Sequence, residues 1–479
     1  MLPMYIQYMG AEAYGLVGFF TLLQSCFNLL DLGLTPTMAR ETARFRGGAS
    51  DVHRYRCLVR ALEIIFLTLA LIGGGVMFGA AGYIASNWLQ VKQLPITDVK
   101  ISLQLISITV ALRWMCGLYR GAISGSERLV WLGGFNAIIA TLRFVGVVLV
   151  LLFIGTTPTI FFSYQLLVAV FELVVLLIQA YHLLPKLPPG KPLIWDWISL
   201  KPALKFSLTI AFPTIVWVLV TQTDKLVLSK ILSLANYGQF TLAVLVANCV
   251  MMISEPVSIS LMPRMAKLEA EGDQSKLIYV YRQSTQLVAM IAGATSITLA
   301  FYAKHLLWVW TGNRTLADQA GPILTLYALG NAILSVSAFP FYLQYAKGNL
   351  RLHLIGNAIF VVLLIPSMVW ISNKYGGIGA GYVWLIMNIV SFVAWLPIVH
   401  NKFAPGLNFK WYMQDVLIIF LAIMTVGYLL NMILPPVDNR WLQLSEISIF
   451  GGLLILTGFL SSSFLRTRIF SPINWVNKE

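Results

Sequence analysis

The sequence predicts an all-α polytopic membrane protein. Of its 479 residues, 58% are hydrophobic and 11% are charged, whereas soluble domains carry about 25% charged residues. Charge-free stretches such as 64–91 and 231–254 contain 28 and 24 residues, and about 20 apolar residues suffice for a spanning helix. Apolar runs such as 147–153 do not alternate with polar residues, as strands of a membrane barrel would.

Hydrophobic runs between charges predict thirteen complete spanning helices. They lie at 14–36, 59–86, 101–122, 130–154, 157–183, 204–231, 236–262, 283–303, 321–346, 352–373, 377–400, 413–434 and 446–465. Residues 1–9 are apolar but too few to cross a bilayer. We expect them to be the end of a further first helix, which is truncated in this sequence.

The distribution of Lys and Arg predicts the orientation in the membrane. Of the 33 basic residues, 23 lie in one set of alternate loops and in the C-terminal tail, 7 lie on the other side and 3 lie inside spans. The richer side is expected to be cytoplasmic, and the C-terminus with it. The net charge of +14 is therefore explained by membrane topology and does not indicate binding to nucleic acid.

The cysteines and histidines give no sign of a metal or cofactor. The 4 cysteines stand singly in or beside apolar segments, and the 5 histidines are scattered near the ends of spans. Neither set has the spacing of a metal or haem site. We expect no metal and no cofactor.

A proline- and lysine-rich stretch divides the chain. Residues 185–203 are expected to form a cytoplasmic linker between an N-terminal helix bundle, 1–184, and a C-terminal bundle, 204–402. Residues 403–479 are expected to form two extra transmembrane helices and a cytoplasmic tail.

The two halves resemble each other. Tyr14-Gly15 matches Tyr237-Gly238 at an offset of 223 residues, and the pattern G-x-x-R-L-x-x-x-G occurs at 125–133 and again at 348–356. Six helices separate equivalent positions, so the repeats run parallel. Repeated helix bundles are typical of secondary transporters, which bind substrate between the repeats.

Three short motifs carry a resemblance to a known family. They are GAEAYGL at 10–16, LDLGL at 30–34 and DKLVL at 224–228. Together they resemble Wzx-type polysaccharide flippases of the multidrug/oligosaccharidyl-lipid/polysaccharide (MOP) exporter superfamily, and the similarity runs over essentially the whole chain. The sequence departs from the family in having nine residues in place of a full first helix.

The resemblance implies a MATE-like fold with two six-helix bundles in parallel repeat plus two C-terminal helices. It also implies a function: translocation of undecaprenyl-pyrophosphate-linked oligosaccharide repeat units across the bacterial inner membrane by alternating access, for O-antigen or other surface polysaccharide. The implied partners are this lipid-linked substrate, membrane lipids, a polysaccharide polymerase and a chain-length regulator.

An anionic head group requires cationic residues that face a cavity. A charge at the bilayer centre costs about 2.5–3.5 kcal/mol on insertion scales, so such residues are retained for a reason. The candidate substrate-binding residues are Arg113, Arg143, Lys225, Arg40 and Arg264. Arg40 and Arg264 are equivalent by the repeat and would form a symmetric entry for the head group, with membrane topology alone as the alternative explanation. The alternative for Lys225 is a lysine that extends from a helix end to the outer interface. The alternative is that Arg113 and Arg143 pair with buried carboxylates and only lock helices together.

Intramembrane acids are candidates for ion coupling, because a carboxylate in a low dielectric can exchange a proton or hold Na⁺. These residues are Asp31, Glu63, Glu172, Asp224 and Glu255. Glu63 lies three residues after Arg60 and has a simple ion pair as its alternative. Asp224 and Lys225 are adjacent and point about 100° apart on a helix, so we expect that they need not neutralise each other.

Two other functions compete with a flippase. An ion-coupled multidrug exporter of the same superfamily should prefer acidic or aromatic cavity residues over Arg113 and Arg143. A membrane polysaccharide polymerase needs a sizeable outer loop, yet the predicted outer loops near 87–100 and 304–320 have fewer than 20 residues. We therefore expect a transporter and not an enzyme.

Overall fold

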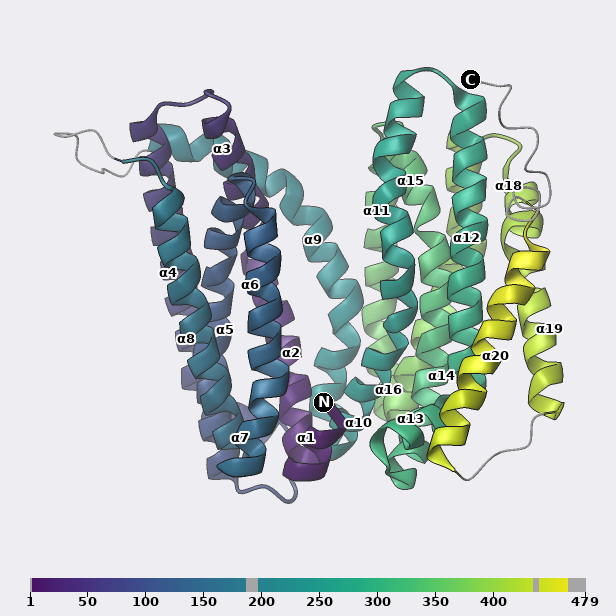
Figure 1. The fold of residues 1–479 in the computed structure, drawn as a ribbon, viewed down its shortest axis with the longest axis horizontal. Helices are drawn as coiled ribbons and strands as arrows, with labels where there is room; N and C mark the ends of the chain where they lie inside the picture. Colours follow the sequence, from purple (N-terminus) through teal and green to yellow (C-terminus); the bar gives the residue numbers. More distant parts are fainter. Residues whose placement is uncertain (1, 187–196, 434–438, 464–479) are drawn as a thin grey trace. The chain divides into compact units, whose positions relative to one another are not determined.

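The computed structural model describes residues 2–186, 197–433 and 439–463, and these are predominantly helical (Figure 1). Helices are the expected solution in a bilayer, since every backbone polar group must find its partner within the segment. Contacts divide the chain into two compact units, Met1–Gly238 and Gln239–Glu479.

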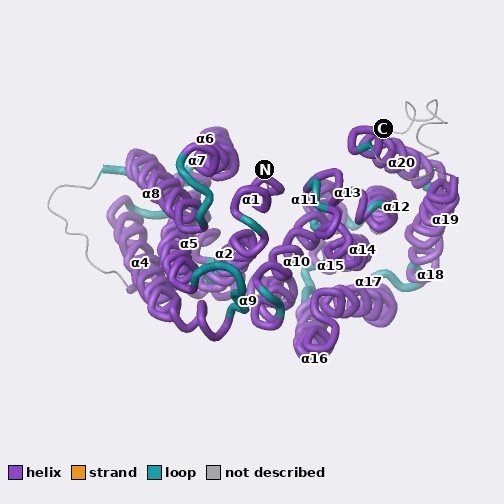
Figure 2. Tube along the Cα trace, turned by 90° about the horizontal axis from the view of Figure 1, so that it is seen from below, coloured by secondary structure: helices purple, strands orange, loops and turns teal. Residues whose placement is uncertain are grey.

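The helices of the first unit surround α5. They are α1 Leu2–Met9, α2 Ala11–Leu30, α3 Leu34–Arg46, α4 Val52–Tyr83 with the π-helical turn η1 Ile84–Trp88, α5 Ile96–Gly125, α6 Leu129–Thr141, η2 Leu142–Gly146, α7 Val147–Phe153, α8 Pro158–Leu183 and α9 Trp197–Ile231. Figure 2, which views the helices end-on, shows α5 between α2, α4 and α8. α9 packs on α2, α3 and α4.

The second unit is built around α12. Its elements are α10 Leu234–Ala247, which begins in the first unit, α11 Cys249–Ala270, α12 Gln274–Phe301, α13 Ala303–Thr311, α14 Arg314–Ser337, α15 Phe339–Ala346, α16 Arg351–Val390, η3 Ser391–Trp395, α17 Leu396–Phe403, α18 Asn408–Lys410, η4 Trp411–Leu417, α19 Ile418–Ile433 and α20 Arg440–Ser461. α12 contacts α11 and α14, and α19 and α20 pack against it and against each other.

The predicted all-α membrane architecture is confirmed. Twelve segments of the described chain are long and apolar enough to span a bilayer. One of them, Arg351–Phe403, has 53 residues and breaks at Gly376, whose backbone is non-helical with φ 57° and ψ −139°. It therefore comprises two helices, which correspond to the predicted spans 352–373 and 377–400.

Two regions predicted from the sequence lie partly outside the described residues. Within the predicted linker 185–203, residues 187–196 lie outside the described residues, as do 464–479 of the C-terminal tail. The boundary between the two compact units follows Gly238, because α9 contacts helices of the first unit.

The repeated Tyr-Gly motif has a structural explanation within the first unit. A side-chain carbon on Gly238 would lie 3.0 Å from the backbone nitrogen of Gly15, and one on Gly15 would lie 2.1 Å from the carbonyl oxygen of Leu234. Any side chain at either position would force the backbones apart. The equivalent residues of the two repeats thus meet at a contact that requires glycine.

Candidate functional site: a polar ladder in the first unit

Two pairs of polar side chains join α5 to α8. Arg113 and Arg120 lie seven residues apart on α5, and Gln165 and Glu172 lie seven residues apart on α8. Seven residues are about two helical turns, so each pair shares one face with a spacing of about 10 Å. Arg113 Nη2 donates to Gln165 Oε1 at 2.7 Å, and Arg120 Nη2 donates to Glu172 Oε1 at 2.5 Å. We call these two contacts the polar ladder.

Arg113 occupies the deeper rung and is incompletely satisfied. The residue is 7% exposed, and its Nε and Nη1 atoms are buried without a hydrogen-bond partner. Its guanidinium lies 5.2 Å from the ring centre of Phe20, a contact worth about 2 kcal/mol when desolvated. No carboxylate of the described residues lies within 4.0 Å of it. The rung therefore keeps a net positive charge and free donors.

The amide of Gln165 extends this rung to a third helix. Its Nε2 donates to the carbonyl oxygen of Arg143 at 3.0 Å. Arg143 lies in η2, a single π-helical turn, and such turns are frequent at functional sites. The carbonyl oxygens of the two residues that flank Arg143 also accept hydrogen bonds. The Tyr164 hydroxyl donates to the carbonyl of Leu142 at 3.1 Å, and the Tyr5 hydroxyl donates to that of Phe144 at 2.9 Å.

The Arg143 side chain is half-buried and lies 5.8 Å from the ring centre of Phe144. Among the described residues, no carboxylate forms an ion pair with it. The structure therefore differs from the alternative in which Arg113 and Arg143 form ion pairs with buried carboxylates.

The second rung is the ion pair between Arg120 and Glu172, and the side-chain amide of Asn136 joins it. Arg120 also donates to Asn136 Oδ1 on α6. Glu172 is 3% exposed, and its Oε2 atom is buried without a partner. Glu172 thus pairs with Arg120 through Oε1 alone.

Glu63 on α4 lies in a separate cluster. Its oxygens accept from Tyr181 at 2.8 and 3.0 Å and from Tyr119 at 3.4 Å. Arg60 Nη1 lies 3.2 Å from Glu63 Oε2, as the three-residue spacing predicts.

Two further candidate residues of the first unit, Asp31 and Arg40, have partners outside the ladder, and Glu255 belongs to the second unit. Asp31 Oδ1 accepts from Thr35 Oγ1 at 2.6 Å and from the Thr35 amide at 3.1 Å, which caps the start of α3. Arg40 is exposed, lies 3.0 Å from Glu41 and covers the ring of Phe206 at 4.1 Å. Glu255 on α11 is exposed.

Arg264 also lies on α11 and is exposed. Since α11 belongs to the second unit, the proposed symmetry between Arg40 and Arg264 rests on the sequence repeat alone.

The expectation for Asp224 and Lys225 is wrong. Lys225 Nζ lies 3.7 Å from Asp224 Oδ1 and donates to the Thr221 carbonyl at 2.6 Å. The long lysine side chain bends back along the helix, so the 100° between adjacent positions does not keep the two charges apart. Asp224 is 3% exposed, which favours such a neutralising partner.

Sequence reasoning missed Arg120 and Gln165 as members of the site. Arg120 contributes to the cytoplasmic charge count, and Gln165 is an uncharged residue in an otherwise apolar span. The usable signal is the repeated seven-residue spacing, which places Arg113 above Arg120 and Gln165 above Glu172. Polar faces on two helices at equal spacing predict a ladder, although they do not predict which helices are neighbours.

Comparison with known protein families finds a match for the part of the chain that contains the polar ladder. Residues 9–316 match the model of a family described as polysaccharide biosynthesis protein. The chain belongs to this family. The matched region includes every residue of the polar ladder and the π-helical turn η2.

The chain is also similar to individual known proteins. A candidate O-antigen transporter from Shigella flexneri is 19% identical over 382 residues, which cover 80% of this chain and 88% of the relative. Among solved structures, the lipid II flippase MurJ in an inward closed conformation has a TM-score of 0.71 at 16% identity, covering 98% of this chain and 97% of MurJ.

An inward-facing multidrug resistance MATE transporter of the MOP superfamily also has a TM-score of 0.71, at 14% identity, covering 84% of this chain and 93% of the transporter. The chain therefore shares its fold with MurJ and with this MATE transporter.

Proposed function

We propose that this chain is a flippase that moves undecaprenyl-pyrophosphate-linked oligosaccharide repeat units across the bacterial inner membrane by alternating access. The product would supply O-antigen or another surface polysaccharide. The family assignment supports a role in polysaccharide biosynthesis. The similarity to an O-antigen transporter and to the lipid II flippase MurJ supports the class of transporter.

The observation that carries the proposal is the state of Arg113. A buried guanidinium with two unpartnered nitrogens offers charge-assisted hydrogen bonds to an anion, which are about twice as strong as neutral ones. Gln165 orients this guanidinium without neutralising it. We propose that Arg113 and Arg143 contact the pyrophosphate, and that Lys225, Arg40 and Arg264 line its route.

The acids have a lesser part in this proposal. Ion coupling would require a carboxylate that exchanges its proton or cation, yet Glu63, Glu172 and Asp224 each lie within 4.0 Å of a basic group. Asp31 and Glu255 have no such ion pair among the described residues and are the better candidates. Coupling through any of them remains a proposal.

The remaining expectations belong to the same proposal. They are a location in the inner membrane with a cytoplasmic C-terminus, two functional bundles at 1–184 and 204–402 joined by 185–203, and the accessory segment 403–479. A polymerase and a chain-length regulator would act on the exported units. The transporter itself forms no covalent bond.

The multidrug exporter is the second candidate, because a MATE transporter has the same fold. A cationic drug would be repelled by Arg113 and Arg143, which form no ion pair with a carboxylate among the described residues. This electrostatic difference favours an anionic substrate.

Deletion of the gene in its native bacterium tests the proposal. We would measure surface polysaccharide and the leaflet location of lipid-linked repeat units, and complement with wild type, Arg113→Gln, Arg143→Ala and the exposed control Arg314→Gln. Units trapped on the cytoplasmic side, rescued by wild type and Arg314→Gln but not by the other two at equal membrane abundance, are expected. Normal polymer in the deletion strain, with greater sensitivity to cationic dyes, would instead identify a drug exporter.

A further inference from the structure

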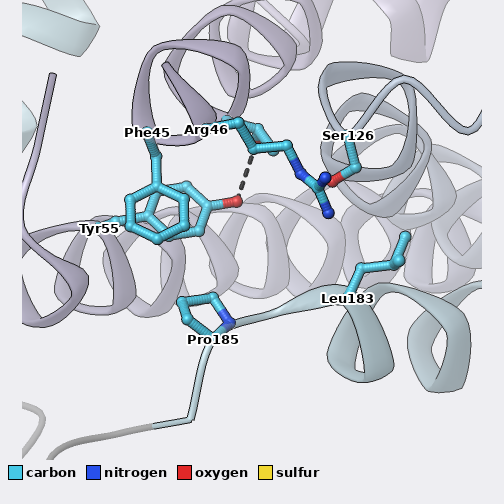
Figure 3. Close-up of a pocket in the computed structure, with 7 residues that line it drawn as sticks. Phe45, Arg46, Tyr55, Ser126, Leu183 and Pro185 are labelled. Atoms are coloured by element: carbon cyan, nitrogen blue, oxygen red, sulfur yellow. Dashed lines mark hydrogen bonds between the residues drawn. The ribbon is translucent and has the colours of Figure 1, made fainter. Parts of the chain in front are cut away.

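Two adjoining cavities open at one end of the first unit, where α3, α6 and α8 end or begin. The smaller has a volume of about 240 Å³ and is lined by residues that include Arg46, Tyr55 and Ser126 (Figure 3). The larger has a volume of about 520 Å³ and is lined by residues that include Arg46, Arg128 and Trp131. Arg46 lines both cavities, so the two share a wall.

The wall around Arg46 is held in place by its neighbours. Thr42 Oγ1 and Tyr55 Oη lie 2.9 Å apart, and the ring of Phe45 stacks on that of Tyr55 with centres 4.4 Å apart. In Figure 3, the Arg46 side chain extends away from these rings toward Ser126. The end of α3 is thus fixed, while the guanidinium reaches across the cavity.

The cavities carry uncompensated positive charge. Arg40 and Arg44 on the same helix pair with Glu41, but in the part of the chain that the structure describes, no carboxylate lies within 4.0 Å of Arg46 or Arg128. The lining also includes Gln179 and His182, which can donate hydrogen bonds. This donor set suits an anion with several oxygens.

The same cavities border the lipid-facing surface. Val130, next to Trp131, is 93% exposed, and Ile178, next to Gln179, is 61% exposed. Apolar side chains of such exposure on spanning helices face hydrocarbon. Trp131 itself stacks on Phe135 with ring centres 5.1 Å apart, and tryptophan is typical of the level of lipid head groups.

We infer that these cavities bind the phosphate group of a lipid head group, with Arg46 and Arg128 contacting its oxygens and Trp131 covering the adjoining glycerol or sugar. The Lys and Arg bias predicts that this end of the unit is cytoplasmic, where anionic lipids attract basic residues. A volume of about 520 Å³ accommodates a phosphate together with such a neighbouring group. The inference goes beyond the proposed flippase and does not require it.

The test uses the purified full-length protein in a neutral detergent, titrated with phosphatidylglycerol or with phosphatidylcholine and observed by native mass spectrometry. Phosphatidylglycerol should bind about ten-fold more tightly. The double variant Arg46→Gln/Arg128→Gln should lose this difference, while Arg46→Lys/Arg128→Lys should retain most of it. Arg44→Gln, which removes an equal charge from the same helix but not from the cavities, should behave as wild type.

Glu127 provides a variant of opposite sign. Its carboxylate lies in the turn before Arg128 and should oppose an incoming anion. Glu127→Gln should therefore strengthen the binding of phosphatidylglycerol. The substituted residues Arg44, Arg46, Glu127 and Arg128 are all exposed, so the variants are expected to fold. Their melting temperatures check this.

A second titration with geranylgeranyl pyrophosphate distinguishes the source of the phosphate. Loss of both ligands in the glutamine double variant would mean that the cavities accept phosphate from either source, and loss of phosphatidylglycerol alone would identify a membrane phospholipid as the source. Equal binding of both ligands to the wild type and the double variant would overturn the inference. A preference for phosphatidylglycerol that persists in the double variant would place the lipid elsewhere and overturn it as well.

Discussion

Gln165 links to Arg143 through a hydrogen bond of 3.0 Å from its Nε2 to the backbone carbonyl, while its Oε1 accepts from Arg113 at 2.7 Å. One uncharged amide thereby joins α5, η2 and α8. A carboxylate could accept from Arg113 but could not donate to the carbonyl, and it would neutralise the guanidinium. The amide is the side chain that orients Arg113 while leaving its charge available.

Two substitutions of Gln165 separate stability from anion binding. Gln165→Leu should lower the free energy of unfolding by about 1.5–3 kcal/mol, because a hydrogen bond to a buried charge is lost. Gln165→Glu should preserve or raise the melting temperature by pairing with Arg113, yet it should reduce flipping of repeat units at least ten-fold. Thermal unfolding in detergent and the leaflet assay measure the two effects. Full transport by Gln165→Glu would show that the free charge of Arg113 is unnecessary.

The ion pair between Arg120 and Glu172 should be strongly coupled. Arg120→Leu leaves a carboxylate that is 4% exposed in its side chain, and an uncompensated buried charge costs about 3–5 kcal/mol. The double variant Arg120→Leu/Glu172→Leu should recover most of this loss, since apolar replacement of a buried pair is often neutral. A double-mutant cycle on melting temperatures measures the coupling. Additive losses would mean that the two side chains do not depend on each other.

In the second unit, Asp415 fastens the segment before α19 to α12. Its carboxylate is fully buried, accepts from Arg282 Nε at 2.6 Å and accepts from Gln286 at 2.6 Å. Asp415→Ala should destabilise the protein by about 3–5 kcal/mol, as breaking a buried pair does. Asp318→Ala is the matched control, because its pair with Lys304 is exposed and is worth about 0–1 kcal/mol. Similar melting temperatures for the two variants would refute this assignment.

Glu12 holds the connection between α4 and α5. Its carboxylate is buried and accepts backbone N–H bonds from Lys92 at 2.8 Å, Gln93 at 2.8 Å and Leu94 at 2.9 Å. Glu12→Leu would leave these amides without an acceptor, at a cost of about 1–3 kcal/mol for each that stays buried. Hydrogen exchange of residues 92–94 should become much faster. Exchange as slow as in the wild type would show that the loop is held by other contacts.

Local interactions were predictable from the sequence. The pair of Arg60 and Glu63 follows from its spacing of three residues along one helix, and the spans follow from their lack of charge. The seven-residue spacings on α5 and α8 are also visible in the sequence. The sequence does not show that these two polar faces contact each other, because either face could have met a different helix or a water-filled cavity.

By itself, the sequence determined that this is an all-α membrane protein with repeated halves, because hydrocarbon allows only helices with satisfied backbones to span it. It also supplied the basic residues that an anion requires. Only the tertiary structure decided which charges remain free. Glu172 lies 52 positions from Arg120 and pairs with it rather than with Arg113, while the flexible stem of Lys225 brings its charge to Asp224. Ion pairing depends on distances of a few ångströms between packed helices, and the order of residues in the chain does not fix those distances.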